Sequence, residues 1–211
     1  MKNTIIEALE WRYAVKKYDV SKKVTEDNLQ ILKDSIRLAP TSYGLQPFKA
    51  IFIKDEKIRE QLKGKSWGQT QVIDASHLVV FVAKKHISTE DVDDYMQNVA
   101  KSRDLRIEQT AGFGDYIKSS IAPMTEGQFV IWNVKQTYIA LGMLLQTAAE
   151  LRIDATPIEG FETEAYDQIL GLTEQGYTTA VVCALGFRHV EDKNQHQAKV
   201  RKSEEELFHT I

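Results

Sequence analysis

Apolar and polar positions follow two different patterns along the chain. The first pattern is typical of amphipathic helices. Near the amino terminus, Ile5, Ile6 and Leu9 are expected to face inward from a short helix. A second helix is expected to begin at Thr25 and to end before Pro40, because a proline ring disfavours helical geometry in the residue before it. Its inward face carries Leu29, Leu32 and Ile36.

The longest helix is predicted over roughly 126–151. Thr125 and Gln128 form a capping box, in which each side chain accepts a hydrogen bond from the other residue's backbone amide. Apolar residues point in almost every direction around this segment. A helix without a clean polar face is typical of a domain centre or a subunit interface, and we expect one of these two environments.

The second pattern is a short, continuous apolar run rich in β-branched residues, which is typical of strands covered on both faces. Three such runs are 50–53, 78–83 and 179–185, and 153–156 is a weaker fourth. The polar segment 87–121 is interpreted as a helical excursion that includes a mobile loop. The charged tail from residue 191 is expected to end in a short helix. Together these elements predict a single α+β domain over residues 1–211.

Composition narrows the class of protein without naming a reaction. The chain is 43% hydrophobic and 27% charged, with a formal net charge of −3, so nothing global favours nucleic acid or an anionic membrane. The amino terminus lacks the apolar core of a secretory signal, and no run is long enough to span a membrane. Cys183 is the only cysteine and lies in an apolar run, where an inert thiol is expected. These features predict a cytoplasmic protein.

The familiar catalytic patterns are absent from the sequence. It contains no glycine-rich dinucleotide fingerprint, no phosphate loop, no nucleophile elbow and no zinc pattern, so no metal is expected. The five histidines show no ligand spacing. If the protein is an enzyme, its chemistry is expected to come from a cofactor.

Four segments are candidates for holding such a cofactor. Arg12 and Lys16 are four residues apart near the end of the first helix and could together hold a phosphate, although helix-terminal cations that complement the macrodipole have the same spacing. The polar loop 39–47 could contact a heterocycle, or could be an ordinary turn. Gly160 follows a strand and allows close backbone approach to a ligand, or a simple turn. Lys199 and Arg201 lie on one side of an extended segment that suits phosphate, or in a solvated tail.

The order and spacing of these segments resemble the FMN-dependent nitroreductase family, in particular the oxygen-insensitive NAD(P)H nitroreductase and dihydropteridine reductase-like branch. The resemblance covers nearly the whole chain. Its most specific parts are Pro-Ile-Glu-Gly-Phe at 157–161 and the closing pair Lys199 and Arg201. It implies a three-layer fold with a central mixed sheet flanked by helices, and an intertwined homodimer. It also implies a small-molecule acceptor and NAD(P)H as the electron donor.

The resemblance implies non-covalent FMN at a defined set of positions. Arg12, Lys199 and Arg201 match the family's phosphate clamp, and the backbone amides of Glu159 and Gly160 are the catalytic groups expected at flavin N5. The residues expected to bind FMN are Arg12, Tyr13, Ala14, Lys16, Thr41, Ser42, Gly44, Gln69, Gln71, Gln136, Pro157, Ile158, Glu159, Gly160, Lys199 and Arg201.

Part of this set is expected from a neighbouring subunit, and part of the substrate mouth aligns less closely. The resemblance implies that the loop 41–44 reaches the flavin of a second copy and that 157–160 stacks on the isoalloxazine. Residues expected to contact the acceptor are Tyr43, Phe113 and Tyr116.

Four residues depart from the family pattern, and the departures concern polar or charged contacts. Ala14 stands where relatives often have serine, and Gly44 where they often have asparagine. Gly68 and Gln71 replace an asparagine and a lysine. Because positive charge near flavin N1 and O2 stabilises the reduced anion, Gln71 predicts a lower potential than in lysine-bearing relatives.

The expected activity is transfer of hydride equivalents from NAD(P)H to nitroaromatics, quinones or related small acceptors, in a ping-pong sequence over one flavin face. Two alternatives are a flavin-holding protein without efficient turnover and a dedicated flavoenzyme, such as a dihydropteridine or flavin reductase or a dehalogenase-like enzyme.

Overall fold

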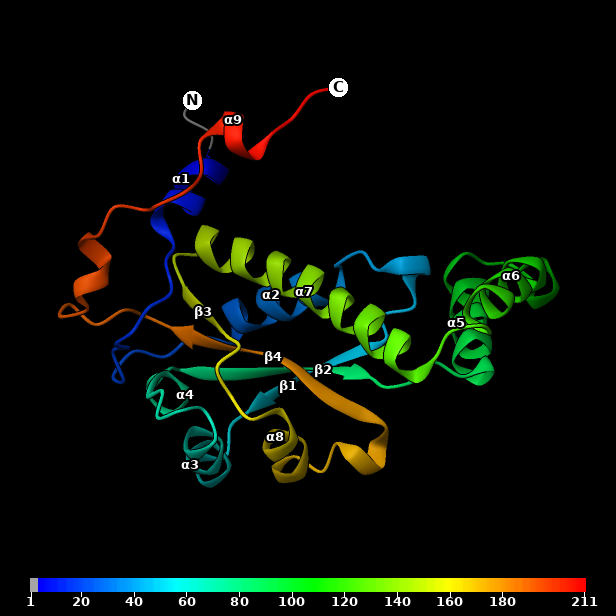
Figure 1. The fold of residues 1–211 in the computed structure, drawn as a ribbon, viewed down its shortest axis with the longest axis horizontal. Helices are drawn as coiled ribbons and strands as arrows, with labels where there is room; N and C mark the ends of the chain where they lie inside the picture. The colour runs from blue at the N-terminus through cyan, green and yellow to red at the C-terminus, as the bar shows by residue number, and fades with distance from the viewer. Residues whose placement is uncertain (1–3) are drawn as a thin grey trace.

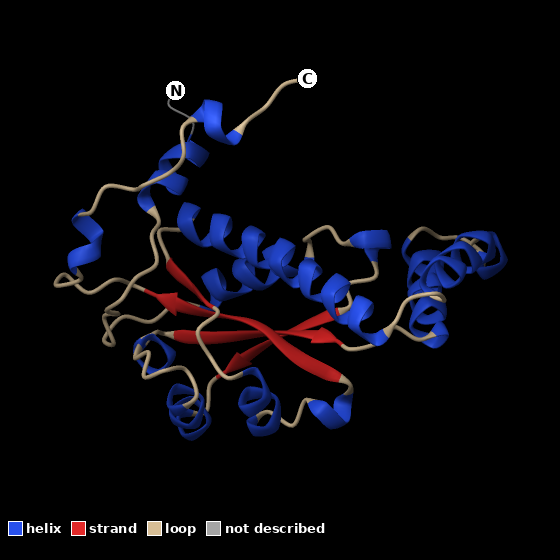
Figure 2. Ribbon diagram, in the orientation of Figure 1, coloured by secondary structure: helices blue, strands red, loops and turns tan. Residues whose placement is uncertain are grey.

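A computed structural model describes residues 4–211, and its elements are arranged in three layers (Figure 1). The middle layer is a four-stranded sheet in the order β1-β2-β4-β3, formed by β1 (Phe48–Ile53), β2 (His77–Lys84), β3 (Asp154–Ile158) and β4 (Tyr177–Gly186). Figure 2 shows these strands enclosed between helices. The expected α+β class and the helical layers on both faces are confirmed.

The expectation of a mixed sheet is wrong for residues 4–211. All three neighbouring pairs, β1 with β2, β2 with β4 and β4 with β3, are antiparallel. The chain leaves β1 and enters β2 at the same end of the sheet, and it does the same between β3 and β4. The two strands of each of these pairs therefore run in opposite directions.

Both faces of the sheet are buried, as the continuous apolar runs predicted. Side chains alternate along β2, so Val79 and Phe81 join one hydrophobic cluster whereas Val80 and Val82 join the other. The first cluster lies under α2 (Glu26–Arg37) and α7 (Glu126–Glu150). The second lies over α3 (Glu56–Gly64), α4 (Gln71–Asp74) and α8 (Thr163–Ile169).

The two principal helices begin where the sequence predicts. The Thr25 side chain accepts a hydrogen bond from the Asn28 amide at the start of α2, and the Thr125–Gln128 capping box starts α7. Helix α7 is buried along one side only. Its other side exposes Ile131, Tyr138, Ile139 and Met143.

Helix α1 (Thr4–Trp11) differs from the prediction. Ile5, Ile6 and Leu9 are 47%, 50% and 42% exposed, and only Ala8 is buried. The reason is that α1 contacts α7 but stands outside the three layers, beside the carboxyl-terminal segment and its short helix α9 (Glu204–Leu207) (Figure 1). The sequence pattern marked an apolar face correctly, but residues 4–211 of one chain do not cover it.

The excursion is helical and projects from one end of the molecule (Figure 1). It consists of α5 (Thr89–Ser102), the 3₁₀ turn η2 (Ile107–Gln109) and α6 (Ala111–Ile121). Gly114 lets the two helices approach, since a Cβ atom there would lie 3.0 Å from the Met96 Cγ atom. Three more 3₁₀ turns are η1 (Ser42–Gly44), η3 (Thr173–Gln175) and η4 (Lys193–His196). Among residues 4–211, no helix combines the length and the apolar character that crossing a membrane requires.

Candidate active site

The first group of predicted residues forms a pocket of about 380 Å³, here called the cationic pocket. Helix α1 ends at Trp11, so Arg12 and Lys16 lie on an extended segment and not on one helical face, as the sequence analysis expected. Both side chains nevertheless line the same pocket. The full lining is Arg12, Tyr13, Ala14, Lys16, Asn194, Gln197, Ala198, Lys199 and Arg201.

An ion pair that the sequence analysis missed holds this segment in place. The Arg188 guanidinium donates to both oxygens of the Asp154 carboxylate, at 2.6 Å from Nη2 to Oδ1 and 3.1 Å from Nε to Oδ2. Its carbon Cζ lies 4.1 Å from the ring centre of Trp11 and 4.4 Å from that of Tyr13. Asp154 is 2% exposed, and the charge of Arg188 is therefore paired within the protein. It positions the residues on either side of Arg12.

A second carboxylate fixes the far side of the cationic pocket. Asp192 accepts hydrogen bonds from the amides of Lys16, at 2.7 Å, Lys17, at 3.1 Å, and Asn194, at 3.0 Å. Burial by itself would raise the pKa of Asp192, but these amides lower it below its ordinary value. Asp192 lies more than 170 residues from Lys16 and Lys17 in sequence, so no local pattern identifies these two contacts.

Four cations and no carboxylate of residues 4–211 line the cationic pocket. The Arg12 Nε atom is buried and has no hydrogen-bond partner within residues 4–211. Burial lowers the pKa of Arg12, and burial together with repulsion from Arg12 and Arg201 lowers the pKa of Lys199. The Lys199 ammonium donates to the carbonyl oxygen of Leu9, at 2.7 Å in the last turn of α1, and to that of Arg12 just after the helix. A buried donor and crowded cations favour binding of an anion such as a phosphate.

The turn after β3 presents the backbone that was predicted to be catalytic. The amides of Glu159 and Gly160 donate no hydrogen bond to any residue of 4–211. Gln69 donates from Nε2 to the Gly160 carbonyl oxygen at 2.7 Å, so one of the predicted residues fixes the orientation of another. Gln71 is buried, and its side-chain amide has no hydrogen-bond partner among the described residues.

Trp67 is a further residue at this turn that the sequence analysis did not select. Its backbone has a φ of 53°, a left-handed conformation that is unusual for a bulky residue. The indole is 74% exposed, yet a Cβ atom on Gly160 would lie only 2.9 Å from its ring. Glycine at 160 is therefore needed for this close approach. An exposed aromatic ring over a strained backbone is typical of a ligand-contacting position.

The Glu159 side chain binds Tyr138 of α7 and does not take part in the turn after β3. Its Oε1 atom accepts a hydrogen bond from the Tyr138 hydroxyl at 2.5 Å. Burial and the Glu159 carboxylate raise the pKa of Tyr138 to about 12, so the phenol stays protonated as the donor. This hydrogen bond orients the Glu159 side chain, and the Glu159 backbone amide is not involved in it.

The second group of predicted residues surrounds the turn η1. Gln136 of α7 accepts from the Ser42 amide at 2.9 Å and donates to the Trp132 carbonyl oxygen at 2.9 Å. Thr41 accepts from the Gln46 amide at 3.0 Å. Both polar ends of the Gln136 side chain are thus engaged by the protein, which makes Gln136 a positioning residue for the loop.

This loop carries a strained tyrosine. Tyr43 has a φ of 55°, and Gly44 follows at 81°. A Cβ atom on Gly44 would lie 2.4 Å from the Tyr95 hydroxyl, so the asparagine that relatives often carry has no room unless Tyr95 moves. The conformation directs the Tyr43 ring against three others, with centroids 6.4 Å away for Phe113, 6.1 Å for Tyr116 and 6.1 Å for Trp132. We call these four rings the aromatic cluster. It unites the three residues predicted to contact the acceptor.

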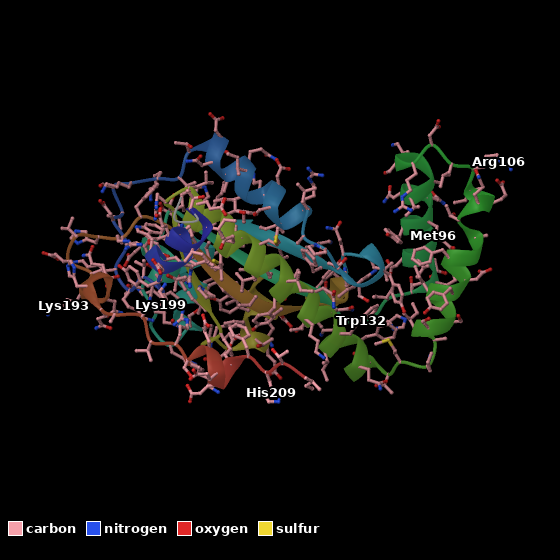
Figure 3. The ribbon with its side chains drawn as sticks, turned by 90° about the horizontal axis from the view of Figure 1, so that it is seen from above. Met96, Arg106, Trp132, Lys193, Lys199 and His209 are labelled. Atoms are coloured by element: carbon pink, nitrogen blue, oxygen red, sulfur yellow. The ribbon has the colours of Figure 1, made fainter. Side chains whose placement is uncertain are left out.

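One chain does not bring the two groups together. The cationic pocket lies at the end of the molecule that carries α1 and the carboxyl-terminal segment, whereas η1 lies toward the projecting helices (Figure 1). Figure 3 shows Lys199 and Trp132 well apart along α7 when the molecule is seen from above. The loop 41–44 therefore does not complete the cationic pocket of its own chain.

Comparison with known proteins identifies the family of the chain. The sequence matches the nitroreductase family over residues 9–187. It is 35% identical to a protein of Staphylococcus saprophyticus named as a candidate NAD(P)H nitroreductase, over 98% of this chain and 96% of that protein. A protein of Staphylococcus epidermidis with the same kind of name is 33% identical over 100% of this chain and 98% of its own length.

Solved structures share the fold at lower sequence identity. A candidate NAD(P)H:FMN oxidoreductase of Staphylococcus epidermidis superposes with a TM-score of 0.87 at 17% identity, over 100% of this chain and 97% of that one. A candidate nitroreductase of Exiguobacterium sibiricum, solved in complex with FMN, gives 0.82 at 16% identity, over 98% and 97%. By sequence and by fold, this chain belongs to the nitroreductase family of oxidoreductases.

Proposed function

We propose that the protein is an FMN-dependent NAD(P)H oxidoreductase that reduces nitroaromatics, quinones or related small acceptors in a ping-pong sequence. Family membership and the FMN-bound structural neighbour support FMN and NAD(P)H as cofactor and donor. The observation that carries the proposal is the buried, unpartnered Arg12 Nε atom in a pocket lined by four cationic side chains and no carboxylate. Such a pocket fits the phosphate of a nucleotide cofactor.

The residues present fit FMN at both of its ends. Arg12, Lys199 and Arg201 would hold the phosphate, and Lys16 would lie near the ribityl hydroxyls. The Glu159 and Gly160 amides, which donate no hydrogen bond to any residue of 4–211, would donate toward the flavin ring. When bound, FMN accepts a hydride equivalent from the donor and passes it to the acceptor. The chain itself binds, orients and supplies hydrogen-bond donors.

A second copy of the chain would complete the site. The loop 41–44 and its support Gln136 lie apart from the cationic pocket of their own chain, so they are available to a partner's. Exposed apolar side chains support a homodimer interface: they occur on α1, on one side of α7 and in the carboxyl-terminal segment. The uniformly apolar pattern of α7 is explained if the sheet covers one side and a partner the other.

The test is anaerobic titration of the yellow protein. Its visible flavin absorption should bleach on addition of NADH or NADPH and should recover on addition of a nitroaromatic or a quinone. FMN that stays oxidised with both donors would indicate a flavin-holding protein. Bleaching without recovery by either acceptor would indicate a dedicated flavoenzyme. A colourless protein that cannot be reconstituted with FMN would contradict the proposal altogether.

A further inference from the structure

A second pocket, of about 420 Å³, lies between η1, the end of α6 and the first half of α7. Its size is that of sites which enclose small organic ligands. The Tyr43 and Trp132 rings form part of the wall, at an interplanar angle of 72°. Ile121, Met124 and Ile131 supply apolar surface around them. We call it the aromatic pocket, and its walls suit a flat aromatic molecule.

Charge in the aromatic pocket is one-sided. Lys135 is the only ionisable cation in the lining, and no aspartate or glutamate lines it. Within residues 4–211, Lys135 forms no ion pair and no side-chain hydrogen bond. An exposed lysine is usually solvated, but here its stem borders a pocket of aromatic and apolar groups. A ligand in this pocket would meet one unpaired positive charge.

Two other polar side chains of the lining are engaged within the protein. The Ser120 hydroxyl donates to the Tyr116 carbonyl oxygen at 2.8 Å, and the Gln128 Oε1 atom accepts from the Thr125 amide at 2.8 Å as part of the capping box. Ser42 binds Gln136 through its backbone, which leaves its hydroxyl without a protein partner in the described part of the chain. Lys135, the hydroxyls of Ser42 and Tyr43 and the Gln128 amide nitrogen are therefore the groups able to pair with a ligand's polar substituent, and among them Lys135 alone carries a charge.

Backbone strain indicates that the pocket is maintained for a ligand. The Tyr43 ring reaches its place from a left-handed backbone, a conformation that is unfavourable for a non-glycine residue. Hydrogen bonds to Gln136 and Thr41 hold the loop in this conformation. Figure 3 shows Trp132 on the part of α7 nearest the projecting helices.

We propose that the aromatic pocket binds the acceptor, and that it selects a flat aromatic molecule bearing an anionic substituent such as a carboxylate. The ring would pack on Tyr43 and Trp132, and the anion would pair with the Lys135 ammonium. This inference rests on the proposed function, because it names the class of acceptor. It assigns Lys135 a role in acceptor specificity that is separate from binding of the cofactor.

The experiment compares 4-nitrobenzoate with 4-nitrobenzamide, which share shape and ring but differ in charge. Dissociation constants are measured calorimetrically on the FMN-bound protein without NAD(P)H, and kcat/KM is then measured with NAD(P)H. We expect the wild-type protein to bind the carboxylate about tenfold more tightly than the amide. Lys135→Gln should remove this preference, and Lys135→Arg should keep most of it.

Lys101→Gln is the matched control, because Lys101 is an exposed lysine on α5 outside the lining of the aromatic pocket. It should retain the wild-type preference. Equal binding of the two acceptors by the wild type, or a preference that survives Lys135→Gln, would overturn the inference; so would failure of both to bind. The proposed function stands or falls separately, on bleaching of the flavin by NAD(P)H and its recovery with any acceptor.

Discussion

The cationic pocket and the aromatic cluster are built by opposite means. Around the cationic pocket, distant carboxylates hold an extended segment in place, and cations are left unpaired toward the pocket. Around η1, a strained backbone and four packed rings give a shape that is complete within one chain. The first region needs an anionic ligand to satisfy it, whereas the second offers a preformed surface. Under the proposed function, electrostatics would hold the cofactor and shape would hold the acceptor.

The strongest way to break this comparison is to remove the carboxylate that supports the cationic side. Asp154→Ala leaves the Arg188 guanidinium, 18% exposed, without its partner, and we expect the free energy of unfolding to fall by about 3–5 kcal/mol. Urea denaturation measures the change. Asp34→Ala, which breaks the exposed pair with Arg37, should leave the midpoint nearly unchanged. An equal loss in the two variants would contradict a special role for Asp154.

The next largest effect should fall on cofactor retention alone. Arg12→Ala removes the buried donor and should weaken FMN binding by about 2 kcal/mol, roughly a 30-fold rise in Kd. The effect should exceed that of Arg201→Ala, since Arg201 is exposed. Fluorescence of released FMN measures both constants, and Arg37→Ala on α2 is the control. FMN affinity that does not change in Arg12→Ala would remove this residue from the phosphate site.

A smaller effect isolates the strain on the aromatic side. Tyr43→Ala and Tyr43→Gly both delete the ring, but only glycine relieves the left-handed backbone. We expect the glycine variant to be more stable than the alanine variant by about 1 kcal/mol, the reverse of the usual order. Thermal or urea unfolding of the two proteins checks this. If alanine proves more stable, residue 43 is not strained and the comparison loses its second half.

The smallest effect is the dependence of the cationic side on pH. Because the folded-state pKa of Asp192 lies below its ordinary value of 3.8, its contribution to stability is present above that value and is lost as the pH falls through the folded pKa. Unfolding midpoints should therefore drop below about pH 4, by less in Asp192→Asn than in the wild type. Parallel curves for the two proteins would show that Asp192 has no such role.

Local patterns were sufficient to predict most of the fold. The four strands, the Thr25 cap and the Thr125–Gln128 capping box all follow from side chains within a few residues of one another. Sheet direction was not predictable in this way, since it depends on how the connections return. The resemblance implied a mixed sheet, but all strand pairs within residues 4–211 are antiparallel.

The cationic pocket shows why the site was harder to predict. The sequence grouped Arg12 with Lys16 by helical spacing, but the helix ends at Trp11. Lys199, bound to a carbonyl in the last turn of α1, and Asp192, bound to the amide of Lys16, hold the extended segment from the other end of the chain. Contacts across nearly the whole sequence leave no periodic signal. Arg188 was missed for the same reason.

Trp67 and the face of α1 were missed for different reasons. An exposed, strained tryptophan looks like any other loop residue in the sequence, and only its approach to Gly160 distinguishes it. The apolar face of α1 was recognised, but periodicity does not say whether the covering surface belongs to the same chain.

The length of helix α7 sets the distance between the aromatic cluster and the cationic pocket. The helix has 25 residues and is about 37 Å long, it carries Gln136 and Trp132 in its first half, and it contacts α1 beside the cationic pocket. Substitutions along its surface change contacts one at a time. A single inserted residue would instead rotate one end of the helix relative to the other by about 100°. The aromatic cluster and the cationic pocket would then change their relative orientation. The length of this helix is therefore under tighter constraint than its sequence.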